Sequence, residues 1–219
     1  MPVLVRLTAA AACITLLQIG DAAAQQPPPL RFEIGARAGL LVGDGKPAND
    51  IGVTGLNLRW RLGEQWSVQF GVQRHTFDAE RPASWLGLDQ DPDVETIDAK
   101  AKATAVSVGL RRDHGAAGSR WGWFWNLDLG AAKTKVPTVN GPLEGGGTFE
   151  IRTRAKREWV VGAGAGVRYQ FSPGWAGEFG LQAEHHQANW RVTDAVSGRS
   201  GKVGAYQAGG LWLGLAAAF

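Results

Sequence analysis

Two adjacent histidines that follow a glutamate are the residues best suited to chemistry in this chain. Glu184-His185-His186 supplies one carboxylate and two imidazoles, the groups that bind Zn²⁺ and similar ions. In a β-strand, neighbouring side chains point to opposite faces, so Glu184 and His186 share a face that His185 leaves. His75 can join them only if its own strand meets theirs across an interior. Because a metal site needs three or four convergent ligands, we expect no metal and no cofactor.

A second candidate is the glycine run Gly162-x-Gly164-x-Gly166. A nucleotide-binding loop needs a different spacing and a helix after it, and neither is present here. These glycines lie at every second position, so in a strand they would share one face. We interpret them as small residues that line a tight interior.

The elements that must position these residues are eight segments in which apolar residues recur at every second position. This period is typical of β-strands, and an apolar face opposite a small or polar face is typical of a membrane barrel. We predict an all-β fold, an eight-stranded antiparallel up-and-down transmembrane β-barrel, with both chain ends on one side. The predicted strands cover residues 30–40, 56–62, 66–75, 103–111, 121–130, 159–171, 175–186 and 211–219.

The polar face of this predicted barrel carries charges that would meet inside a narrow lumen. Isolated ions are costly in a low dielectric, so we expect these charges to pair with one another. Eight strands enclose a space that side chains can fill, so we expect a plugged lumen or a narrow water path. The candidate network comprises Glu33, Arg37, Arg59, Arg61, Arg111, Asp128, Arg168, Glu178, Glu184 and His186.

Connections and aromatic residues indicate how the barrel would lie in a membrane. Short turns, such as residues 63–65 and 172–174, alternate with long polar stretches at 43–50, 78–96, 133–157 and 192–202, which we interpret as loops. Aromatic rings prefer the membrane boundary. A girdle near the short turns is expected from Trp60, Trp66, Trp121, Trp123, Tyr169, Phe171 and Trp175, and a second near the long loops from Phe77, Phe149, Trp159 and Trp190.

The first 24 residues predict a cleaved secretory signal, with Arg6 before a short apolar run and Ala22-Ala23-Ala24 at its end. Residues 25–29 would be a short linker before the barrel at 30–219. The formal net charge of +3 is too small to suggest nucleic-acid binding. A soluble periplasmic ligand-binding barrel remains an alternative, with the apolar face turned inward instead.

These features resemble the small outer-membrane barrels typified by the OmpA transmembrane domain and by Opa-type and porin-like proteins. The most specific part is the last strand, with Leu211, Leu213, Leu215 and the terminal Phe219. In that group, such a strand is the signal read by the barrel assembly machinery. The resemblance implies a monomer in the outer membrane of a Gram-negative bacterium, with a structural or surface-interaction role. A narrow ion or solute channel is the alternative.

The segment His186-Gln187-Ala188-Asn189 is similar to the His-x-Ser-Asn motif of lipid A deacylases of the PagL type. Ala188 stands where that resemblance requires the nucleophilic serine, and alanine has no hydroxyl to attack an ester. We therefore expect no catalytic residue and no enzymatic activity. Lipid modification remains an alternative if another nucleophile exists.

Charge differs between two of the expected loops. Residues 78–95 are acidic, whereas residues 133–157 contain the basic group Arg152, Arg154, Lys156 and Arg157. The simplest interpretation is that both are solvated loops. The functional alternative is that the basic loop contacts lipopolysaccharide phosphates while the acidic loop holds divalent ions.

Overall fold

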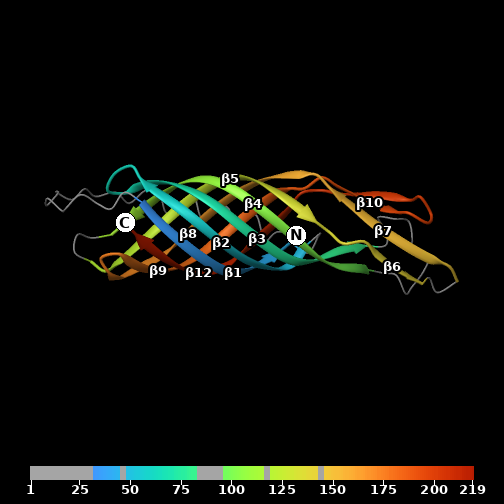
Figure 1. The fold of residues 1–219 in the computed structure, drawn as a ribbon, viewed down its shortest axis with the longest axis horizontal. Coiled ribbons are helices and arrows are strands. Elements are labelled where there is room, and N and C mark those ends of the chain that lie inside the picture. Colours follow the sequence, from blue (N-terminus) through green and yellow to red (C-terminus); the bar gives the residue numbers. More distant parts are fainter. Residues whose placement is uncertain (1–31, 45–47, 83–95, 116–118, 143–145) are drawn as a thin grey trace.

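The computed structural model describes residues 32–44, 48–82, 96–115, 119–142 and 146–219. The predicted signal and linker lie outside these residues, as does most of the acidic stretch. The described chain forms one closed barrel of eight strands, in the order β1-β12-β9-β8-β5-β4-β3-β2, with every neighbouring pair antiparallel. The predicted fold class is thus confirmed (Figure 1).

The barrel strands extend further toward the long loops than the sequence pattern predicted. No helix in the described part of the chain is long and apolar enough to cross a membrane. The barrel strands are β1 (Phe32–Gly43), β2 (Ala48–Arg61), β3 (Trp66–Pro82), β4 (Thr96–His114), β5 (Trp121–Lys135), β8 (Arg157–Ser172), β9 (Trp175–Gln187) and β12 (Tyr206–Ala218).

The barrel closes where its first strand meets its last. β1 pairs with β12 from Glu33↔Ala218 to Gly43↔Ala208. Beyond this ladder, the Phe219 amide donates to the Phe32 carbonyl at 3.0 Å. The start of β1 and the end of β12 therefore lie at the same end of the barrel, the end that also holds the short turns. We call it the short-turn end.

Alternation between the two faces is as predicted. Leu40 in β1 is 70% exposed and Leu213 in β12 is 65% exposed, whereas Glu33 is 1% exposed. The apolar side chains cover the outer wall, and the polar and small side chains line the lumen. Glycine makes room for the larger lumen residues: a Cβ on Gly180 would lie 2.7 Å from the Trp212 ring.

Four short strands continue beyond the barrel at its long-loop end, in a region that the sequence analysis wrongly interpreted as loops. They form a sheet in the order β11-β10-β7-β6, and Figure 1 shows β6, β7 and β10 projecting from the barrel. We call this sheet the extension. Its strands are β6 (Val139–Pro142), β7 (Thr148–Ala155), β10 (Trp190–Asp194) and β11 (Ser200–Val203).

An apolar core fills the long-loop end of the lumen and the inner face of the extension. It joins barrel residues such as Leu41 and Phe77 to extension residues such as Val192. Its buried members are Leu41, Ile51, Val53, Phe77, Ala79, Ala101, Ala103, Ile151, Ala188, Trp190, Val192, Val203, Tyr206 and Ala208.

The residues of the two predicted aromatic girdles differ in exposure. At the short-turn end, Trp60, Trp121, Trp123, Phe171 and Trp175 are exposed on the outer wall, and Trp66 and Tyr169 are partly exposed. The second girdle is wrong: Phe77 and Trp190 are buried in the apolar core, and Phe149 packs against it. Of the four residues, Trp159 alone is exposed.

Candidate functional site in the barrel lumen

The structure places all ten residues of the predicted lumen network on the inner face or at its mouth. Glu33, Arg59, Arg111, Asp128, Glu178, Glu184 and His186 are buried, and Arg37, Arg61 and Arg168 are partly exposed. They form a layer of ion pairs near the short turns, a middle group held by amides, and a histidine–carboxylate cluster toward the extension. Gln182 joins the last two, because it accepts from Arg37 and donates to Glu184.

The ion-pair layer consists of Glu33, Glu178 and the arginines that surround them. Arg59 bridges the two carboxylates: it donates to Glu33 and, at 2.7 Å, to Glu178. Arg168 also bridges them, at 2.6 Å to Glu33 and 2.9 Å to Glu178. Arg111 adds a bond to Glu178 at 2.8 Å. Glu33 Oε1 and both oxygens of Glu178 therefore contact two of these guanidinium groups each.

A residue that the sequence analysis missed adds a third carboxylate to this layer. Asp113 accepts from Arg111 at 2.6 and 2.9 Å, so that three carboxylates oppose the three arginines named above. Asp113 is two residues from Arg111 and therefore on the same face of β4, so the alternation could have identified it. Arg61, nearest the mouth, lies 3.5 Å from Glu33.

The middle group does not pair as the sequence analysis expected. Asp128 accepts hydrogen bonds from Asn126 and, at 2.6 Å, from Gln69, rather than pairing with an arginine. Arg37 donates to Gln182 at 3.0 Å. Asp128 and Arg37 thus bond to amide side chains, where the sequence analysis expected ion pairs. Sequence reasoning paired opposite charges, and an amide has no charge to pair.

The histidine–carboxylate cluster consists of His75, Glu158, Glu184 and His186. Glu184 Oε2 lies 3.4 Å from His75 Nε2 and 3.0 Å from His186 Nε2. His186 Nδ1 lies 3.7 Å from Glu158 Oε2. The condition for His75 to join the cluster is met, because β3 and β9 lie opposite each other. The expectation that no three ligands converge is therefore wrong.

Other sequence candidates near the cluster do not converge on it. His185 is exposed on the outer wall, as alternation predicted, so it cannot reach Glu184 through the lumen. Ala188, which stands at the nucleophile position of the deacylase-like motif, is buried in the apolar core. Gly162, Gly164 and Gly166 lie on the lumen side of β8, where Gly166 lies opposite Gly180 in register.

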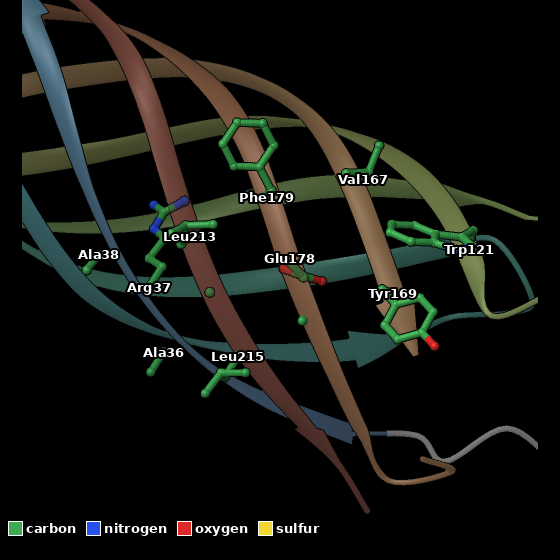
Figure 2. A pocket seen from close by; sticks show the side chains of 12 residues that line it. Ala36, Arg37, Ala38, Trp121, Val167, Tyr169, Glu178, Phe179, Leu213 and Leu215 are labelled. Atoms are coloured by element: carbon green, nitrogen blue, oxygen red, sulfur yellow. The ribbon is translucent and has the colours of Figure 1, made fainter. Parts of the chain in front are cut away.

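A shallow groove crosses the outer wall near the short-turn end, between β1, β12, β9 and β8 (Figure 2). Small residues such as Ala36 and Gly177 form part of its lining, beside the larger Phe179 and Tyr169. Arg37 and Glu178 also line it, but their hydrogen bonds are to lumen side chains. The groove is largely apolar and is part of the apolar outer wall, so we assign no chemistry to it.

A row of cations follows the apolar wall at the long-loop end. Arg74, Lys133 and Arg157 lie in one row across β3, β5 and β8, because Thr104 of β4 pairs with both Arg74 and Lys133 and Lys133 pairs with Arg157. Lys102 and Lys135 face each other one step further out. All five side chains are exposed. We call Arg74, Lys102, Lys133, Lys135 and Arg157 the cationic rim.

Comparisons with known proteins give matches to solved structures alone. No family model and no curated relative matches the chain. Neisserial surface protein A is 13% identical with a TM-score of 0.52, covering 86% of this chain and 96% of its own. OprG from Pseudomonas aeruginosa is 11% identical with a TM-score of 0.51, covering 84% and 94%. The outer-membrane protein AlkL is 13% identical with a TM-score of 0.51, covering 92% and 97%. The chain therefore has the fold of the small eight-stranded outer-membrane β-barrel proteins.

Proposed function

We propose that this protein is an OmpA-like, porin-like barrel of the Gram-negative outer membrane. Its role is structural or surface-interacting rather than catalytic, and its cationic rim contacts the phosphates of lipopolysaccharide. In this proposal the chain is a monomer inserted by the barrel assembly machinery, which reads Leu211, Leu213, Leu215 and Phe219. All four of these side chains are exposed on the outer wall.

The outer wall supports a membrane location. Leucine, valine and aromatic side chains cover it below the cationic rim, while the buried charged groups face the lumen. A soluble ligand-binding barrel requires the opposite arrangement, with polar residues outside. Amphipathic aromatic rings favour a membrane–water boundary, and the exposed aromatic side chains at the short-turn end are consistent with such a boundary there. We infer that the short turns face the periplasm and that the extension faces the cell exterior.

The filled lumen favours this role over a channel. The ion-pair layer closes the periplasmic half, where the side chains of Glu33, Arg59 and Glu178 are at most 4% exposed. The apolar core closes the other end. An ion that passed through would have to displace paired charges and then cross apolar side chains, and both steps are costly.

The cationic rim is the observation that carries the proposed lipopolysaccharide contact. Val72, Val106, Ala131 and Trp159 form the apolar row beneath it, two residues closer to the barrel centre. At about 3.3 Å per residue, the cations lie roughly 7 Å beyond that row. Anionic headgroups lie at this boundary and attract nearby lysine and arginine side chains. Arg157 is the member of this rim that the sequence analysis also assigned to phosphate contact.

The other predicted phosphate ligands lie on the extension. Arg152 is bonded to Glu150 at 2.8 Å, which occupies part of its guanidinium. Arg154 lies beside Arg191 in register, and Arg191 lies beside Lys202. These three exposed cations provide a matched control, because they carry the same charge as three rim lysines but lie on the extension.

The test compares two triple variants of the folded chain. One replaces Lys102, Lys133 and Lys135 with glutamine, and the other replaces Arg154, Arg191 and Lys202 with glutamine. We measure the affinity of each for lipopolysaccharide at low and at high salt, since phosphate contacts weaken as salt screens them. The proposal predicts that the rim variant loses most of the salt-dependent affinity and that the extension variant keeps it.

Two results would count against the proposed contact. Equal losses in both variants would mean that net charge alone attracts the lipid. Unchanged affinity in the rim variant would mean that the rim does not touch the phosphates.

A further inference from the structure

We propose that His75, Glu184 and His186 bind one divalent transition-metal ion of the Zn²⁺ type inside the lumen. This inference does not depend on the proposed surface contact, because it rests on side chains that the rim does not touch. The three residues offer two imidazole nitrogens and one carboxylate oxygen, all within 4.8 Å of one another. Three such protein ligands are typical of zinc sites that keep a fourth position for water.

The two distances from the carboxylate oxygen to the imidazole nitrogens fit such an ion. Glu184 Oε2 lies 3.4 Å from His75 Nε2 and 3.0 Å from His186 Nε2. In a tetrahedral site with metal–ligand bonds of about 2.0–2.1 Å, neighbouring ligand atoms are roughly 3.3 Å apart. Both carboxylate–imidazole distances are within a few tenths of an ångström of that spacing.

Unpartnered nitrogens provide a second, independent observation. His75 is 2% exposed, and neither of its ring nitrogens has a hydrogen-bond partner among the described residues. A buried polar group without a partner is costly, and such a group in a native structure calls for an explanation. A metal bond to Nε2, the nitrogen nearest Glu184, explains why this imidazole lies in the lumen.

The surroundings hold each ligand in an orientation suited to binding. Thr134 and Trp190 both donate to Glu158 Oε1 at 2.6 Å, which leaves Oε2 facing His186 Nδ1. When Nδ1 of His186 donates toward Glu158, the lone pair of Nε2 points at the ion. A carboxylate behind a metal-bound histidine is a common feature of zinc sites.

Two further contacts orient Glu184 and His186. Gln182 donates to Glu184 Oε1, leaving Oε2 for the ion. Tyr206 stacks on the His186 ring, with centroids 4.5 Å apart and planes at 9°. Both ligand side chains are thus held before the ion arrives, and this lowers the conformational cost of binding.

The charge of the cluster also favours a cation. Glu158 and Glu184 are buried carboxylates, and no lysine or arginine among the described residues forms an ion pair with either one. A divalent cation neutralises both when the two histidines are neutral. The competing arrangement contains no metal and instead holds a doubly protonated His186 between the two carboxylates. These two arrangements differ in measurable metal content.

The position of the site gives the ion a mechanical role. His75 belongs to β3, and the other two ligands belong to β9. These strands are separated by four steps around the barrel in either direction, through β8, β5 and β4 or through β12, β1 and β2. The ion therefore joins opposite walls across the lumen. Because the cluster is buried beneath the apolar core, metal uptake should accompany folding.

The experiment refolds the full chain in detergent with and without ZnCl₂, removes free zinc by gel filtration in the presence of a chelator, and measures bound zinc by elemental analysis. We expect one zinc per folded wild-type chain and a higher melting temperature when zinc is present during refolding. His75→Gln and Glu184→Gln should lose the zinc. Glu158→Gln should weaken zinc affinity by roughly 10- to 100-fold, as removal of such outer partners commonly does.

His185→Gln is the matched control, because His185 lies beside two of the ligands on β9 but faces outward. It should retain its zinc. Folded wild-type chain that holds no zinc overturns the proposal and supports the metal-free arrangement. Equal zinc retention in His75→Gln and His185→Gln also overturns it. If the ligand variants do not fold, Co²⁺ bound to wild type decides: intense visible bands of tetrahedral cobalt are expected, and their absence rejects the site.

Discussion

The ion-pair layer and the histidine–carboxylate cluster differ in how their buried polar groups are paired. In the ion-pair layer, every oxygen of Glu33 and Glu178 contacts arginine, and Arg59 Nε is the one atom of the pairs without a partner. In the histidine–carboxylate cluster, His75, His186 and Glu158 all have buried atoms without partners.

The ion-pair layer and the histidine–carboxylate cluster are thus similarly buried but differ in their chemistry. In the ion-pair layer, Arg59 Nε is the one buried atom left without a partner, so the layer fills space and fixes strands. A set with free lone pairs can accept a ligand. Unpaired histidine nitrogens, and carboxylates without an arginine or lysine ion pair, distinguish the candidate binding site from the ion-pair layer among the described residues.

The largest effect should follow from breaking the ion-pair layer. Glu178→Ala removes the one carboxylate that contacts Arg59, Arg111 and Arg168 together. Loss of one partner of a buried ion pair costs about 3–5 kcal/mol. Denaturant unfolding of the detergent-refolded chain measures the loss. Glu64→Ala, in an exposed turn, is the control and should change stability by less than about 0.5 kcal/mol. Equal effects would show that the layer does not stabilise the barrel.

A smaller change in stability should show how tightly the lumen is packed at two heights along β8. A Cβ on Gly166 would lie 2.3 Å from the Phe179 carbonyl, whereas a Cβ on Gly162 would lie no closer than 3.7 Å to any neighbour. Gly166→Ala should therefore cost about 1–3 kcal/mol through overpacking. Gly162→Ala, on the same face of β8 beside Glu184, is expected to be tolerated. Comparable unfolding free energies for the two variants would rule out this difference in packing.

The smallest effect should appear in the extension. Burial raises the pKa of Asp194, but hydrogen bonds from Ser197 and from the backbone amides of Glu150, Val196 and Ser197 outweigh it and leave the pKa below 3.8. A lowered pKa means that the carboxylate stabilises the turn above the unfolded-state pKa. This contribution is lost as pH falls through the folded-state pKa.

Asp194→Asn should remove most of that acid sensitivity. We expect a cost of about 1 kcal/mol at neutral pH. Limited proteolysis of the extension at neutral and acidic pH measures the effect, and the barrel itself should remain protected. Cleavage of the wild-type extension that does not change with pH would contradict the assignment.

Sequence reasoning identified the features that depend on alternation. The eight strands, the outward face and the inward position of residues such as Glu33, Glu178 and Glu184 all follow from the period of two. The contact of His75 with Glu184 across the lumen did not follow, because alternation gives the face of a residue but not its height in the barrel. His75 was therefore left apart from Glu184.

The extension was not predicted for a different reason. Its strands are four to eight residues long, so the alternation is too short to stand out from a polar loop. Trp190 and Phe77 were misplaced for a related reason. An aromatic residue near the end of a strand can face the membrane boundary or the apolar core, and the sequence does not distinguish the two.

Single-channel recording in planar bilayers tests the filled lumen most directly. The preparation should first show a band that migrates faster when unboiled, which identifies a closed, detergent-resistant barrel. Our account predicts no stable conductance from this preparation, because the ion-pair layer and the apolar core block both halves of the lumen. Reproducible conductance steps from the same preparation would contradict the account and favour the narrow channel.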